Sequence, residues 1–268
     1  MAAIEHILTA MQKSGAGSRA AWRVDDPGAP RDAVWAALPP MSAEPGHLDA
    51  NRIVTARRSD PASGAFDMMR TRVLHHLQQN GWTSVAITSP TAGGGKSVVA
   101  LNLAFSLANR EDCRTALLDL DLRRPGIAAI LGISDPPPLE SYLRGQAGLE
   151  QAFGRLRANL AVACNGSPVR LAAELLQGPE TARAFQEMKR KLLPDVVVCD
   201  LPPMMASDDM VAFLPNVDCA ILVVEAEVNT ADEVDACERE LAAQTNVLGV
   251  VLNKCRHGAD MAPHRNRS

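Results

Sequence analysis

The segment SVAITSPTAGGGKSVVALNLAFSLA, residues 84–108, constrains the fold of this chain more than any other stretch. An apolar run leads directly into a glycine-rich loop, and an apolar helical pattern follows at once. Glycines allow the backbone to turn sharply, so that consecutive N–H groups can point at one bound anion. The start of the following helix adds further N–H donors and the positive end of its dipole. This order of elements therefore predicts a phosphate-binding loop.

The residues of this loop predict ATP with Mg²⁺ as the ligand. Lys96 can reach the β- and γ-phosphates, and the hydroxyl of Ser97 is placed to bind Mg²⁺. The loop departs from the usual G-x-x-x-x-G-K-[ST] pattern at its first position, because Pro90 stands where glycine is expected. The other residues predicted to bind the nucleotide here are Thr91, Ala92, Gly93, Gly94, Gly95 and Val98.

Apolar runs of strand length alternate with helical stretches along the rest of the chain. Continuous apolar strands separated by helices are typical of a parallel sheet that is covered on both faces. Because crossovers between parallel strands are right-handed, we expect an α/β fold with a doubly wound, mostly parallel sheet, as in P-loop NTPases. A helix over 65–79 is predicted to end at Asn80-Gly81. The predicted strands cover residues 84–88, 116–120, 160–163, 196–199, 220–224 and 248–252.

Two carboxylates, Asp119 and Asp121, lie at the end of the second predicted strand. Because they are two residues apart, they project to the same face of an extended strand. Such a pair can hold a hydrated Mg²⁺ or accept a proton from an attacking hydroxyl or water. We therefore predict catalytic roles for both, with Lys96, and a metal-binding role for Asp121. Arg123 and Arg124 can offset phosphate charge or merely neutralise the acids, and the sequence leaves this open.

Two later strand ends also carry polar groups. Asp200 ends a buried strand, where a carboxylate is costly without a partner, so it is the expected Walker B residue that contacts Mg²⁺ through water. Asp208 and Asp209 are predicted helix N-cap residues. At the last strand end, Asn253 could hydrogen-bond the nucleotide base while the stem of Lys254 covers the ring.

Composition bounds the location and the class of partner. The six cysteines form no CxxC pair, so we expect buried, reduced thiols and a reducing compartment. The start of the chain has no secretory-signal pattern, and its apolar runs fall far short of the roughly 20 residues of a membrane helix. The expected location is cytoplasmic, with any membrane recruitment through a partner. The net charge of −4 gives no support for a nucleic-acid partner.

The two ends of the chain lack the alternation of apolar strands and helices that marks the middle. Residues 4–13 have apolar residues at helical spacing and could form a short helix, whereas 14–45 are rich in Gly, Pro, Ala and Ser and predict a flexible linker. We therefore expect an N-terminal arm at 1–50, a nucleotide-binding domain at 51–257 and a flexible tail at 258–268.

Four segments in this order resemble the bacterial tyrosine kinases of capsule and exopolysaccharide synthesis (the CpsD/CapB type): TSPTAGGGKS, LLDLDLRRP, VVVCDLPP and GVVLNK. The resemblance covers about residues 63–255. It implies nucleotide, Mg²⁺ or catalytic roles for Lys96, Ser97, Asp119, Asp121 and Asp200. It also implies a membrane-embedded, Wzz-like polysaccharide co-polymerase as partner, whose cytoplasmic segment activates the kinase, and a capacity to form a homo-oligomer.

The chain departs from this family at two places. The family phosphorylates a tyrosine-rich C-terminal tail, but the only tyrosine of this chain is Tyr142, which we expect to pack in a helix. The family's Glu-x-x-Arg-x-x-Arg oligomerisation pattern aligns with Gly64, Asp67 and Arg70, so two of its three charges are lost.

Three functions follow from these features. The first is an ATP-dependent kinase-like enzyme that acts on another protein. The second is a nucleotide-gated regulator whose output is binding rather than chemistry. The third is a positioning ATPase of the MinD/ParA type, against which Thr91 counts, because those proteins carry a signature lysine at this position.

Overall fold

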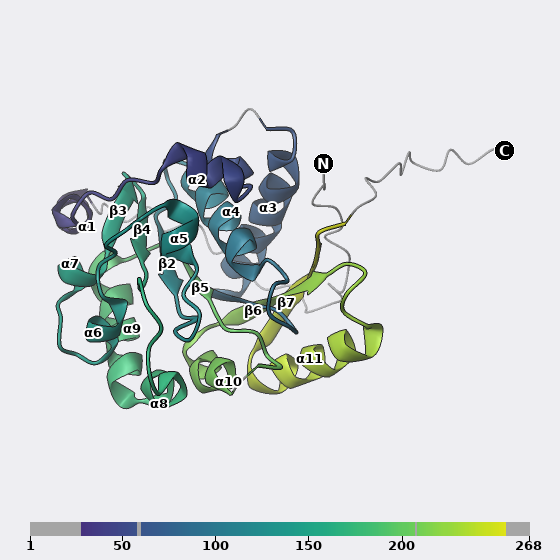
Figure 1. The fold of residues 1–268 in the computed structure, drawn as a ribbon. Helices are drawn as coiled ribbons and strands as arrows, with labels where there is room; N and C mark the ends of the chain where they lie inside the picture. Colours follow the sequence, from purple (N-terminus) through teal and green to yellow (C-terminus); the bar gives the residue numbers. More distant parts are fainter. Residues whose placement is uncertain (1–27, 58–59, 207, 256–268) are drawn as a thin grey trace.

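The computed structural model describes residues 28–57, 60–206 and 208–255. Within them the chain forms a seven-stranded sheet of order β3-β4-β2-β5-β1-β6-β7 (Figure 1). All neighbouring strands are parallel except β3 and β4, which are antiparallel. The strands are β1 Ser84–Thr88, β2 Thr115–Asp119, β3 Gly154–Arg157, β4 Leu160–Ala163, β5 Val196–Asp200, β6 Cys219–Glu225 and β7 Asn246–Asn253.

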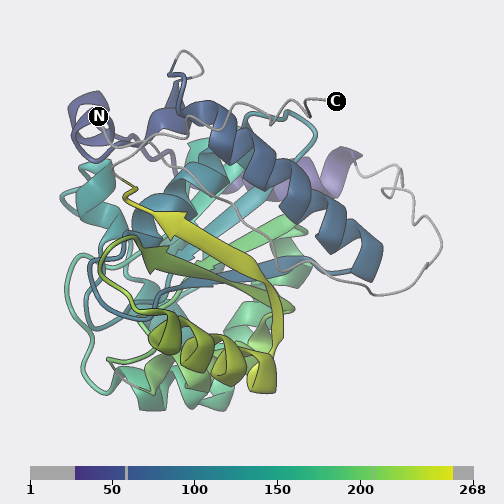
Figure 2. The same ribbon diagram turned by 90° about the vertical axis from the view of Figure 1, so that its right-hand side faces the viewer.

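Helices cover both faces of this sheet, and Figure 2 shows α3 and α11 on opposite sides of it. One layer contains α2 Pro45–Ala50, α3 Ser63–Asn80, α4 Lys96–Ala108 and α5 Ile127–Leu131. The other contains α1 Gly28–Ala37, α6 Leu139–Leu143, α7 Leu149–Ala152, α8 Ala172–Gln177, α9 Pro179–Leu192, α10 Asp209–Phe213 and α11 Ala231–Gln244. Two short 3₁₀ helices lie at Val54–Ala56 and Leu214–Asn216.

The core is divided by the sheet into two apolar clusters. Val85 and Ile87 of β1 pack with α3, α4 and α5, whereas Ala86 between them packs with the opposite layer. Alternate residues of a strand point to opposite faces, so strands covered on both sides must be apolar throughout. This explains the continuous apolar runs of the sequence and confirms the predicted doubly wound fold.

The observed strands agree with the six predicted ones to within two residues at each end. Helix α3 ends at Asn80, as predicted, and Gly81 after it has a left-handed conformation. The strand missed by the sequence is β3, Gly154–Arg157. It lies at the edge of the sheet and contains two arginines, so it lacks the apolar run by which the other strands were recognised.

The prediction of a flexible linker is wrong for residues 28–45. From Gly28 the chain forms α1, and its Trp35 and Leu38 are buried in the core with exposed fractions of 2% and 1%. Pro40 then forms a parallel bridge with Arg155 of β3. The burial of two large apolar side chains outweighs the Pro- and Gly-rich composition. The predicted helix at 4–13 and the tail at 258–268 lie outside the described residues.

We expect Trp35→Ala to lower the free energy of unfolding by about 3 kcal/mol, the lower end for a buried tryptophan. The indole ring is buried, and its Nε1 donates to the carbonyl of Leu192 at 2.7 Å. Urea unfolding of the full chain measures the effect, with the part-exposed Trp82 changed to alanine as the control. A loss equal to or smaller than that of Trp82→Ala would show that α1 is not part of the folded domain.

Candidate functional site

The candidate site lies at the carboxyl ends of three neighbouring strands, β2, β5 and β1. Asp119 at the end of β2 is the register partner of Asp200 at the end of β5, and Asp200 pairs in turn with Ile87 near the end of β1. Because carboxyl ends of parallel strands meet at one edge of the sheet, the glycine-rich loop after β1 lies beside both carboxylates. Figure 1 shows β2 and β5 side by side in the sheet.

The loop backbone has a conformation that requires glycine at two positions. Gly93 and Gly95 have φ values of 89° and 85°, a region that L side chains rarely adopt. A Cβ on Gly95 would also lie 2.3 Å from Nδ2 of Asn253. Helix α4 begins directly at Lys96, so the N–H groups of its first turn point toward the loop. This geometry is that of an anion-binding loop.

The side chain of Lys96 lies among carboxylates. Its Nζ contacts Oδ2 of Asp121 at 2.8 Å and Oδ1 of Asp200 at 3.3 Å, and it is 3.3 Å from the hydroxyl of Ser97. Lys96 is 8% exposed, Asp121 4% and Asp200 0%. The structure thus brings together four of the residues that the sequence predicted for the metal and catalytic roles.

Asp119 has different partners from Asp121, although both were predicted to project to one face of a strand. Strand β2 ends at Asp119, and Asp121 lies beyond it. Oδ2 of Asp119 accepts from the backbone N–H groups of Gly126 and Ile127, both at 2.9 Å, at the start of α5. Asp119 therefore positions α5, and only its other oxygen remains for chemistry.

Burial and mutual repulsion shift the charges of this cluster. Burial raises the pKa of Asp200, and Lys96 offsets this only in part. Burial and the nearby Asp200 likewise raise the pKa of Asp119. Burial alone would lower the pKa of Lys96, but the carboxylates of Asp200 and Asp121 outweigh it and raise that pKa. The site therefore holds more negative charge than one ammonium group compensates.

This excess of acceptors fits a cation. Oδ1 of Asp119 and Oδ2 of Asp200 are buried and have no hydrogen-bond partner in the described part of the chain. No group of three or more His, Cys, Asp or Glu side chains there forms a complete metal site by itself. Mg²⁺ commonly takes one or two carboxylates and obtains its other ligands from water and substrate phosphates, so the residues present suit it.

Two asparagine side chains hold the phosphate loop. Asn253, predicted to bind the base, donates from Nδ2 to the carbonyl of Gly94 at 2.9 Å. Asn229, which the sequence did not indicate, donates to the hydroxyl of Thr91 at 3.0 Å. These contacts fix the loop to the segment between β6 and α11 and to the end of β7. Base recognition by Asn253 stays a prediction, and Lys254 forms an ion pair with Glu225 at 2.9 Å.

The predicted N-cap role of Asp209 is wrong. Asp208 occupies the N-cap position of α10 but makes no side-chain cap hydrogen bond, and Asp209 is the first residue of the helix. The carboxylate of Asp209 instead accepts from the guanidinium of Arg123. Arg123 therefore neutralises an acid, Asp209, which lies 86 residues further along the chain.

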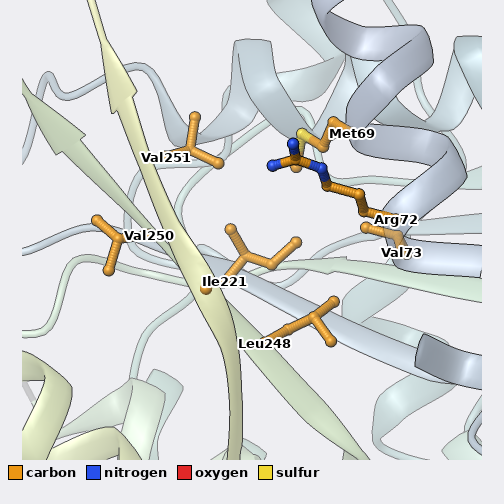
Figure 3. A pocket seen from close by; sticks show the side chains of 8 residues that line it. Met69, Arg72, Val73, Ile221, Leu248, Val250 and Val251 are labelled. Carbon is orange, nitrogen blue, oxygen red and sulfur yellow. The ribbon is translucent and has the colours of Figure 1, made fainter. Parts of the chain in front are cut away.

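Other expectations concern regions outside the site. All six cysteines are buried, as predicted, and none is joined to another by a disulfide. Among the described helices, none is both long and apolar enough to span a membrane. An apolar groove between α3 and β7, lined by Met69, Val73, Ile221, Leu248 and Val251 among others, lies beside the middle of β6 and β7 (Figure 3). It is thus separate from the strand ends that carry the carboxylates.

One family model and several known proteins resemble this chain. The ParA model, described as NUBPL iron-transfer P-loop NTPase, matches residues 82–266. EpsB of Ralstonia solanacearum, named as a tyrosine-protein kinase, is 30% identical over 202 residues, which make up 74% of this chain and 26% of EpsB. The chain therefore spans only about a quarter of the length of that relative.

Two further similarities cover most of the other protein. CapB of Staphylococcus aureus, also named as a tyrosine-protein kinase, is 28% identical over 194 residues, which make up 72% of this chain and 84% of CapB. The solved kinase domain of the Escherichia coli tyrosine kinase Etk has a TM-score of 0.67 at 27% identity, over 76% of this chain and 80% of that one. These findings confirm the resemblance that the sequence motifs indicated.

Proposed function

Because the chain belongs to the ParA family of P-loop NTPases and several relatives that it matches are named as bacterial tyrosine kinases, we propose that it is an ATP-dependent, tyrosine-kinase-like protein. It regulates the polymerisation and export of an exopolysaccharide or capsule. The observation that carries the proposal is the cluster of Lys96, Asp121 and Asp200 beside the glycine-rich loop.

The chain's own residues have distinct parts in this proposal. Backbone N–H groups of residues 91–98 bind the phosphates, and Lys96 turns from the carboxylates toward the β- and γ-phosphate oxygens. Ser97, Asp121 and Asp200 would hold Mg²⁺, which would neutralise charge on the phosphate oxygens. The free Oδ1 of Asp119 accepts the proton of the acceptor hydroxyl, and the raised pKa of this carboxyl suits a general base.

The phosphate acceptor is a tyrosine of another protein. Tyr142, the only tyrosine of the chain, is 2% exposed, and its hydroxyl donates to the carbonyl of Ala184 at 2.8 Å. Burial also raises the pKa of this phenol, which opposes its deprotonation. An intramolecular acceptor role for Tyr142 would require local unfolding of α6 from α9.

We expect Tyr142→Phe to leave phosphotyrosine formation unchanged within about twofold, because only a buried hydrogen bond of about 1 kcal/mol is removed. Incorporation of labelled phosphate into the acceptor protein measures this. The accompanying loss of thermal stability serves as a check that the hydroxyl was engaged. A fall in total phosphotyrosine to background would instead identify Tyr142 as the acceptor.

The proposed partner is the cytoplasmic segment of a membrane polysaccharide co-polymerase, which would recruit the chain to the inner face of the membrane. Assembly into the ring suggested by the family's charged helix pattern is less supported. Arg70 of α3 pairs with Asp67 at 2.7 Å and donates to the carbonyl of Ser106 at 3.0 Å, so both aligned charges serve the α3–α4 contact within one chain.

A second function, a nucleotide-gated regulator without kinase activity, is favoured by the lack of an accessible tyrosine. In it, ATP stabilises the state that controls the co-polymerase by binding that state better. An Asp119→Asn variant separates the two functions. Normal polymer length without phosphoryl transfer supports the regulator, whereas loss of both supports the kinase.

The kinase proposal is tested by incubating the full chain with labelled ATP, Mg²⁺ and membranes that contain the co-polymerase. We expect phosphotyrosine on a protein other than this chain, and none with Lys96→Ala. Absence of phosphotyrosine on every protein, while ATP is still bound, would exclude kinase activity and leave the regulator.

A further inference from the structure

Arg123 and Asp209 form a two-bond ion pair beside the candidate site. Nε and Nη2 of Arg123 donate to the two carboxylate oxygens of Asp209, the Nη2–Oδ1 distance being 2.9 Å. The Asp209 side chain is 1% exposed and that of Arg123 is 51% exposed. Such bidentate pairs fix the relative orientation of their partners as well as their separation. We refer to this pair as the Arg123–Asp209 latch.

The latch joins two segments that are far apart in the sequence and belong to different secondary-structure elements. Arg123 lies in the loop after β2, whereas Asp209 begins α10, 86 residues later. Asp208 and Glu174 add negative charge around the same guanidinium. A buried carboxylate without a partner is strongly unfavourable, so the guanidinium of Arg123 stays bound to Asp209 at the start of α10.

Further contacts connect the latch with the phosphate loop. The N–H groups of Met204 and Met205 donate to the carbonyls of Ser89 and Pro90 at 2.8 and 3.0 Å, which ties the segment after β5 to the phosphate loop. The latch then ties the end of that segment to the loop after β2. That loop carries Asp121, whose contact with Lys96 leads back to the phosphate loop.

We propose that Arg123 and Asp209 are positioning residues that hold Asp121, in the loop after β2, at the separation from Asp200 that Mg²⁺ needs. Asp121 precedes Arg123 by two residues, whereas Asp200 is the last residue of β5 and is held by its neighbours in the sheet. In the described part of the chain, neither latch residue makes a hydrogen bond or ion pair with the phosphate loop or Lys96, so the latch acts through the loop after β2. The inference rests on the proposed nucleotide site but not on kinase activity.

The test compares Mg²⁺ affinity with ATP affinity in the full chain. Calorimetry gives the Kd for ATP without Mg²⁺, and Mg²⁺ titration of the ATP complex gives the Kd for the metal. We expect Arg123→Gln and Asp209→Asn each to weaken Mg²⁺ binding about tenfold, as for residues that orient metal ligands, with ATP affinity without Mg²⁺ unchanged. The double variant should be no weaker than either single one, because both remove the same contact.

Two controls separate positioning from stability. Arg144→Gln removes the 2.9 Å pair with Glu140 at the end of α6 and should leave Mg²⁺ affinity unchanged. Arg123→Lys keeps the positive charge but cannot form the two parallel hydrogen bonds of a guanidinium group, so it should remain folded with an intermediate Mg²⁺ affinity. Unchanged Mg²⁺ affinity in folded latch variants, or an additive loss in the double variant, would overturn the latch alone. No ATP binding by the unmodified chain would overturn the nucleotide site and the latch together.

Discussion

Replacing Lys96 by alanine is expected to weaken Mg·ATP binding by about 100-fold or more, which corresponds to about 3 kcal/mol. Lys96 is the only cation recorded in contact with Asp121 and Asp200 in the described structure, and the γ-phosphate would enter the same cluster. Without the ammonium group, a triphosphate would face Asp119, Asp121 and Asp200 uncompensated. Like charges at this separation in a buried site repel strongly.

Displacement of a fluorescent ATP analogue from the full chain measures this effect. Lys191→Ala is the matched control, because Lys191 forms an ion pair with Glu187 within α9, at 2.6 Å, on the surface of the protein. This variant should bind ATP normally. If Lys96→Ala bound ATP within threefold of the unmodified chain, the triphosphate could not lie at this loop.

The second large effect is that of Asp200→Asn, which should lower phosphoryl-transfer activity but raise the stability of the nucleotide-free protein. We expect phosphoryl transfer to fall at least about 100-fold, because the metal loses a carboxylate that stabilises the transferring group. Without nucleotide, however, the same variant should be more stable by about 1 kcal/mol, since it removes a buried negative charge while Lys96 keeps Asp121 as a partner.

The pH dependence of stability follows from the raised pKa of Asp200. A group with a raised folded-state pKa binds more protons in the native state, so its contribution is present below the unfolded pKa of about 4 and is lost as pH rises through the folded value. The free energy of unfolding without nucleotide should therefore fall with rising pH above about 4. Asp200→Asn should flatten that slope.

Asp218→Asn provides the contrasting control. The carboxylate of Asp218 accepts from two N–H groups and the Ser84 hydroxyl at 2.6–2.9 Å, and these bonds outweigh burial and lower its pKa. Its contribution is present above the unfolded pKa and lost as pH falls, so this variant should be less stable at neutral pH. Urea unfolding from pH 4 to 8 compares both variants, and equal destabilisation by both would contradict the excess charge inferred at Asp200.

Much of the fold could be predicted because buried parallel strands leave a continuous apolar pattern in the sequence. The strands beside the site, β1, β2 and β5, are of this kind. Strand β3 could not be recognised, because an edge strand that is covered less need not be apolar. Helix α1 was missed because its stability comes from packing Trp35 and Leu38 on distant residues, which local composition does not reveal.

The candidate site was predictable where chemistry requires certain residues at fixed spacing. The glycine-rich loop, Lys96 and the acidic strand ends are such features, and the structure places them together. Contacts between distant segments leave no local pattern. The sequence therefore indicated neither the pairing of Arg123 with Asp209 nor the hydrogen bond from Asn229 to Thr91. It also could not reveal that one carboxylate oxygen of Asp119 accepts hydrogen bonds from the start of α5.

Calorimetric titration of the full chain with ATP, with and without Mg²⁺, tests most directly whether this loop and its acids form a nucleotide site. We expect one saturable site per chain, with higher ATP affinity when Mg²⁺ is present and no binding by the Lys96→Ala variant. A well-folded chain that gave no heat of binding with Mg·ATP, alone or with its membrane partner, would contradict it.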